Sequence, residues 1–155
     1  MRGAVLKAVL SAALRCRKGA SAVEFALVAP ILVAMLVALG DLGTAVFERM
    51  EVASAAQAGA QLAATKGWDA ASIENAVTSA SGLATITATP APTQSCGCPS
   101  GGAITTVQCG SACPDGAPAG TYVTVNAQAQ YSTIVSYPGL PNPLTLTGQA
   151  VMRIQ

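Results

Sequence analysis

An uncharged apolar run over residues 25–40 constrains this chain more than any other feature of its sequence. With the five residues before it, it forms a stretch of 21 residues, 20–40, whose one charged side chain is Glu24. At about 1.5 Å rise per residue, a helix of this length crosses a hydrocarbon core of about 30 Å. Because lipid offers the backbone no hydrogen-bond partner, a lone segment crossing it must be a helix. The sequence therefore predicts a transmembrane helix, assigned to residues 20–43.

Charge is distributed unevenly about this run. Residues 1–19 hold five basic residues and no acid, whereas residues 20–155 hold three basic and seven acidic residues, a net charge of 3 − 7 = −4. The positive-inside rule then places the N-terminus in the cytoplasm and the chain after about residue 45 on the other side. Since no basic patch exists beyond residue 19, no nucleic-acid partner is expected.

The junction between the basic residues and the apolar run has a distinct pattern. Three basic residues come before Gly19, Ala20 follows it, and an acid, Glu24, comes next to Phe25; the basic residues are Arg15, Arg17 and Lys18. The stretch GASAVEFALVAPILV resembles the processing site of type IV prepilins. In its closer form it resembles the TadE-like minor pseudopilins of tight-adherence (Tad, or Flp-type) pilus systems. The resemblance extends over residues 15–65.

The resemblance implies how such a chain matures and where it acts. A prepilin peptidase would cut between Gly19 and Ala20, removing residues 1–19 as a cytoplasmic leader, and Glu24 would serve processing and assembly. The protein would cross the inner membrane once, with its C-terminus in the periplasm, and could enter the pilus after processing. Its implied partners are the other Tad pseudopilins, the major pilin, the inner-membrane assembly platform and the lipid bilayer. The same pattern suits TadE-like and TadF-like subunits, so both remain open.

Three alternatives compete with this interpretation. A conventional signal peptide with its apolar region at 25–39 would need small residues just beyond, and residues 40–43, GDLG, are a poor cleavage site. An uncleaved, single-pass adhesion or cell-envelope module would need the same helix and no cut. The simplest alternative is that Glu24 lies at the headgroup boundary and has no function. The free-energy cost of placing an acid in an apolar run favours a function instead.

The cysteines predict a stapled loop. Of five cysteines, Cys16 lies in the leader, and the cut would leave four: Cys96, Cys98, Cys109 and Cys113. Their spacing does not match the CxxC knuckles of zinc sites, and an exported domain favours two disulfides. A Cys96–Cys98 bond would close a very tight loop, so each of the two is expected to bond to Cys109 or Cys113, with the pairing open. No metal or cofactor is expected.

The residues that enzymes most often use are missing or scattered. The chain has no histidine, which removes the commonest general base. It also has no phosphate-binding loop and no dinucleotide fingerprint. The sequence therefore predicts a protein that is not an enzyme.

The expected fold class is α+β. A long N-terminal helix, half transmembrane and half periplasmic, precedes a second short helix and a small, mostly antiparallel sheet with the cysteine-stapled loop. A periplasmic domain is assigned to residues 44–155. Its helices are expected at about 44–66 and 69–80, and its strands at about 84–89, 103–108, 121–135 and 144–154. The last two strands are expected to pair with each other.

Two packing details complete the prediction. In the second helix, Asp69 is expected near the N-cap, with Ile73 and Val77 buried. In the first helix beyond the membrane, the packing face is expected along positions at near-helical spacing: Val46, Met50, Ala53, Gln57, Ala60 and Ala64.

Overall fold

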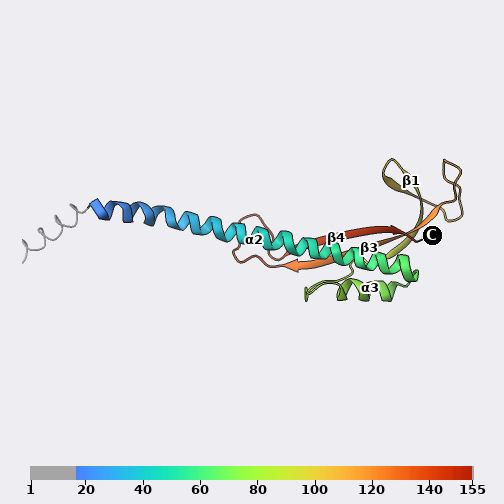
Figure 1. Cartoon of the computed structure of the whole chain (residues 1–155), viewed down its shortest axis with the longest axis horizontal. Coiled ribbons are helices and arrows are strands. Elements are labelled where there is room, and N and C mark those ends of the chain that lie inside the picture. Colours follow the sequence, from blue (N-terminus) through green and yellow to red (C-terminus); the bar gives the residue numbers. More distant parts are fainter. Residues whose placement is uncertain (1–16, 155) are drawn as a thin grey trace, which may run out of the picture. The chain divides into compact units, whose positions relative to one another are not determined.

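The computed structural model describes residues 17–154. It confirms the α+β class (Figure 1). The elements are α2 (Arg17–Lys66), α3 (Ala70–Ser79), β1 (Thr93–Ser100), β2 (Ala103–Val107), β3 (Gly120–Tyr131) and β4 (Leu144–Arg153). The strands form one antiparallel sheet in the order β2-β1-β3-β4. The chain divides into two compact units, an N-terminal unit that ends at Asp41 and a sheet unit, Leu42–Gln155.

The core of the sheet unit lies between one face of the sheet and its two helical segments (Figure 1). Ile73 and Val77 of α3 are buried in it, as predicted. Alanine, valine and isoleucine make up most of the core, which consists of Val52, Ala55, Ala56, Ala60, Ala63, Ile73, Val77, Ile86, Val123, Val125, Ala127, Ala129, Tyr131 and Leu146. Because these side chains are small, the layers must approach closely to exclude water.

Two glycines permit that approach. A Cβ atom at Gly148 of β4 would lie 2.7 Å from Cα of Ala53, so the strand rests directly on the helix backbone. A Cβ at Gly59 of α2 would lie 2.7 Å from Cγ2 of Val77 and 3.1 Å from Cγ1 of Val125. Since real Cβ atoms do not come this close to their neighbours, α2 packs against β4, α3 and β3 only because these positions have no side chain.

The packing face predicted for α2 was wrong. Val46 is 51% exposed and Met50 is 67% exposed, and of the six predicted positions only Ala60 is fully buried. The buried residues instead form a neighbouring face of the helix, and they too recur at helical spacing: Val52, Ala55, Ala56, Gly59, Ala60 and Ala63. Alanine occurs on every side of this part of α2, so the spacing of small residues alone does not distinguish one face from another.

Strands β3 and β4 pair antiparallel from Tyr122↔Arg153 to Tyr131↔Leu144, which confirms the predicted pair. Both strands alternate between a core face and an outer face. Strand β3 ends at Tyr131, four residues before the predicted end at 135.

The outer face of the sheet is polar but almost uncharged. Hydroxyl and carboxamide side chains make up most of it, and some bond across strands: Gln149 Nε2 donates to Asn126 Oδ1 at 2.9 Å, and Gln130 Nε2 donates to Thr145 Oγ1 at 3.2 Å. Cross-strand pairs of this kind stabilise a sheet modestly. Arg153 is the one ionisable side chain that β4 adds to this face.

The first half of the sheet differs from the prediction. Residues 84–89, expected as a strand, form only an isolated bridge, Thr87↔Gln128. The ladder does not extend because the hydroxyl of Thr85, rather than its backbone, bonds the amide and carbonyl of Gln130. Conversely, β1 lies inside the stretch expected as a loop, 90–119.

A tight hairpin joins β1 to β2. Its two central residues, Gly101 and Gly102, have φ of +57° and +84°. Positive φ at both positions is what a type I′ turn requires, and that turn matches the twist of antiparallel strands. Strand β2 then follows close to its predicted range, 103–108.

Asp69 caps α3 as expected. Its carboxylate accepts hydrogen bonds from the amide of Ser72 at 3.3 Å and from the Ser72 hydroxyl. The side-chain hydrogen bond from Ser72 is the main reason that the pKa of Asp69 lies below its ordinary value of 3.8.

We expect Asp69→Ala to lower the melting temperature of the sheet unit slightly, because two donors at the start of α3 lose their acceptor. The charge contributes stability above the unfolded pKa, and the contribution disappears as pH falls below about 3.8 and through the lower folded pKa. Asp69→Asn keeps an acceptor but does not titrate. Thermal unfolding from neutral to acid pH should therefore show the wild-type advantage over Asp69→Asn shrinking; an advantage that is constant with pH would contradict this account.

Candidate functional site

The most distinctive surface of the molecule is the N-terminal part of α2. Large apolar side chains are exposed on every side of the helix, including Phe25 at 68% and Leu27 at 71%. Others are Val23, Val28, Ile31, Leu32, Val33, Met35, Leu36 and Leu39. A helix that is apolar all round belongs in lipid or among other helices, because water does not solvate such a surface favourably.

This part of α2 is also long enough to cross a bilayer. By length and composition, Ser21–Lys66 contains a stretch that could cross a membrane. The mean hydropathy of this stretch is 2.5, and none of its residues is buried. The helix continues without a break through Pro30. Asp41, at the end of the apolar run, is only 3% exposed.

The residues of the predicted processing site lie at the start of this helix. Arg17, Lys18, Gly19 and Ala20 belong to α2, and Arg15 and Cys16 fall outside the described residues. The side chain of Glu24 is exposed on the apolar surface next to Phe25. Ala20 precedes Glu24 by four residues, which is about 6 Å along the helix axis.

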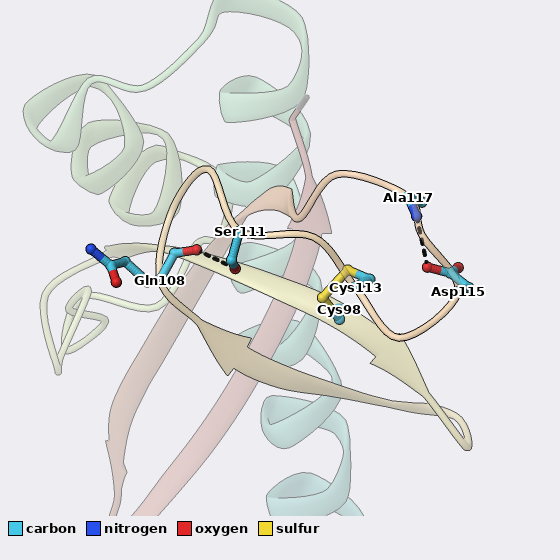
Figure 2. Close-up of a disulfide and its surroundings, with 6 residues drawn as sticks. All are labelled: Cys98, Gln108, Ser111, Cys113, Asp115 and Ala117. Carbon is cyan, nitrogen blue, oxygen red and sulfur yellow. Dashed lines mark hydrogen bonds between the residues drawn. A yellow bond between two sulfur atoms is a disulfide. The ribbon is translucent and has the colours of Figure 1, made fainter.

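Two disulfides join β1 to the loop that follows β2. Cys96 bonds to Cys109, and Cys98 bonds to Cys113, so both members of the CxC pair cross to the following loop. Figure 2 shows the second bond beneath that loop, where the Ser111 hydroxyl donates to the Gln108 carbonyl and the Ala117 amide donates to Asp115. The four cysteines are thus used structurally within β1 and the 108–119 loop.

One apolar surface was missed by sequence reasoning. The connection between β3 and β4, residues 132–143, exposes Ile134 at 77% as well as Val135 and Leu140. The Tyr131 hydroxyl just before it is hydrogen-bonded to the Thr44 hydroxyl of α2 at 2.5 Å. The sequence marked this segment only as a turn, because nothing local shows which part of the fold it adjoins.

The remaining surface of residues 17–154 offers little sign of chemistry. Two shallow hollows lie on the outer face of the sheet, one lined by Thr89, Pro90, Asn126, Ala127, Gln128, Thr147, Gly148 and Gln149, the other by Ser95, Gly102, Ile104, Thr106, Tyr122, Thr124 and Val151. Neither lining contains a charged side chain. Within residues 17–154, no three metal-ligating side chains come together.

A long apolar helix joined to a small disulfide-bonded sheet fits a single-pass membrane protein. Within this class the match is specific: residues 19–61 fit the family model described as TadE-like protein. The match begins at Gly19 and includes Glu24, which confirms the resemblance to TadE-like proteins for this part of the chain. Comparison with curated proteins and with solved structures gives no significant match.

Proposed function

We propose that this chain is a minor pseudopilin that initiates or supports a Tad/Flp-type pilus. It would be inserted in the inner membrane with its N-terminus in the cytoplasm, cut by a prepilin peptidase between Gly19 and Ala20, and assembled with other pseudopilins and the major pilin through α2. The observation that carries this proposal is the TadE-like match over residues 19–61, which falls on a helix whose large apolar side chains are exposed.

The proposed mechanism is an exchange of surroundings for one helix. In the membrane, the apolar side chains of α2 contact lipid; in an assembly they would contact the same part of neighbouring subunits. Lipid tails are as apolar as leucine, so close packing and polar contacts between helices must favour the assembled state. The role is structural, and no reaction is assigned to the chain itself.

Glu24 would supply the polar contact. After the cut, the α-amine of Ala20 would be a positive group one helical turn away, on this chain or on a neighbour. An ion pair in a water-poor assembly offsets part of the cost of burying the carboxylate, and a carboxylate left alone there would be strongly unfavourable. Glu24 would thereby fix how far one helix is offset from the next.

We expect the protein from cells with an active prepilin peptidase to begin at Ala20. N-terminal sequencing or intact mass measures this directly, and cells without the peptidase provide the uncut reference. Gly19→Val removes the residue after which the cut would occur, so that variant should keep residues 1–19; Gly43→Ala, farther along α2, should be cut normally. A wild-type chain that begins at Met1 beside an active peptidase would instead favour the uncleaved envelope module.

We expect Glu24→Ala to abolish or strongly reduce piliation while the protein still enters the membrane. Glu24→Gln keeps the shape without the charge and should fail similarly if the ion pair matters. Glu74→Ala, an acid removed from α3 instead, serves as the matched control. Counting pili by electron microscopy and measuring the variant in the membrane fraction separate assembly from insertion, and normal piliation of Glu24→Ala would remove this role.

A further inference from the structure

We infer that residues 132–143, the connection between β3 and β4, form a second membrane contact that holds the sheet unit against the bilayer surface. The inference rests on the proposed anchoring of α2 in a membrane. It concerns a different part of the chain, the segment STIVSYPGLPNP. We call this segment the β3–β4 loop. Its partner is the lipid interface, not another protein.

The position of the loop along α2 is the first argument. The hydrogen bond between Tyr131 and Thr44 places the start of the loop beside Thr44. Thr44 comes four residues after Gly40, the end of the apolar run, which is about 6 Å along a helix. The polar interfacial layers of a bilayer add about 5 to 8 Å beyond each side of the hydrocarbon core. The loop therefore starts within the depth of the headgroup layer.

The chemistry of the loop is the second argument. It carries no charged residue. It exposes Ile134, Val135 and Leu140, whose side chains would gain free energy on leaving water. Tyr137, which is partly exposed, has the amphipathic ring that is typical of membrane interfaces. An apolar, uncharged segment with a tyrosine suits the lipid boundary better than bulk water.

The positions of charged side chains in the sheet unit show how far this membrane contact can extend. Along α2, the next charged side chain after Asp41 is Glu48, about 6 Å beyond Thr44. Strand β3 carries the sheet away from the loop, from Tyr131 to Gly120, over about 36 Å. Asp115 and Arg153 lie toward that far end. Asp115 is in the loop after β2, and Arg153 of β4 pairs with Tyr122 near the start of β3. The apolar contact is thus confined to the end of the unit beside Thr44.

The test uses tryptophan as a depth reporter in the full chain. Trp68 is the sole tryptophan, so Trp68→Phe gives a silent background. Ile134→Trp and Leu140→Trp report on the loop, and Leu36→Trp reports on the membrane-spanning part of α2. Ile104→Trp reports on exposed β2, which lies beyond the Gly120 end of β3. Each protein is reconstituted in phosphatidylcholine vesicles whose acyl chains carry bromine near the headgroup, which quenches tryptophan on contact. Retained disulfides and circular dichroism confirm folding.

We expect the Ile134 and Leu140 reporters to be quenched nearly as much as Leu36, while the Ile104 reporter keeps its intensity. Quenching at Leu36 with none at Ile134 or Leu140 would overturn the loop contact and leave the anchoring of α2 intact. Absence of quenching at Leu36 as well as at Ile134 and Leu140 would overturn the anchoring, and the inference with it. Blue-shifted but unquenched emission at Ile134 would mean that protein, not lipid, covers the loop, and equal quenching at Ile104 would mean that the contact is not confined to it. Either result would overturn the inference.

Discussion

Replacing Gly148 by alanine should destabilise the sheet unit by about 3 kcal/mol, the upper part of the range for overpacked positions. The new Cβ would lie 2.7 Å from Cα of Ala53, 2.8 Å from its amide nitrogen and 2.9 Å from the carbonyl carbon of Val52. All three are helix backbone atoms, so no side chain can rotate away to make room. Relief requires β4 to move off α2, which opens a gap along a core made largely of alanine and valine.

Gly82→Ala is the matched control for this change. No atom lies within 4 Å of where its Cβ would be, and its φ is not in the left-handed region, so the same added methyl should have little effect. Thermal unfolding of the full chain in detergent, followed by the fluorescence of Trp68, would compare the two variants. Equal stability of Gly148→Ala and Gly82→Ala would show that the contact between β4 and α2 is looser than described.

Removing either disulfide should cost about 3 kcal/mol, the value expected when a bond closes a loop of about 15 residues. The bonded cysteines are separated by 13 residues in Cys96–Cys109 and by 15 in Cys98–Cys113, so the two paired variants, Cys96→Ser/Cys109→Ser and Cys98→Ser/Cys113→Ser, should lose similar amounts. The loss should concentrate in β1, β2 and the loop after them, because β1 is short of large apolar side chains.

Hydrogen exchange separates this local loss from a global one. Amides of β1 and β2 should exchange faster in either paired variant, while those of β3 and β4 change less. Reductant should destabilise the wild-type protein but have no effect on a variant with all four serines. Unchanged exchange in β1 after either bond is removed would mean that its pairing with β3 is sufficient without the staples.

The sequence predicted the parts of the fold in which local pattern and tertiary packing agree. From Val123 to Tyr131, strand β3 alternates strictly between apolar and polar residues, and Asp69 stands before a short amphipathic helix, so the presence of both elements was predicted. Strand β1, TQSCGCPS, has a glycine, a proline and no large apolar residue, and it forms because strands on both sides and two disulfides hold it. The Gly101-Gly102 pair was a usable hairpin signal that the loop-like composition around it concealed.

The two candidate surfaces differ in how far they could be predicted. The processing pattern is linear: Gly19, Glu24 and the apolar run follow one another in sequence, so it can be recognised without a fold. The membrane contact proposed for the β3–β4 loop depends on the pairing of Tyr131 with Thr44, which are 87 residues apart. The packing face of α2 was mistaken for a related reason, since Gly59 has its effect only when Val77 and Val125 lie against it.

The near absence of ionised groups from the outer face of the sheet has a consequence for the environment in which the protein can work. Hydroxyls and carboxamides neither titrate in the range where carboxylates and amines do nor attract a counterion atmosphere. The hydration of this face, and its contact with any neighbour, should therefore be nearly the same in fresh and brackish water and in mildly acid and alkaline surroundings.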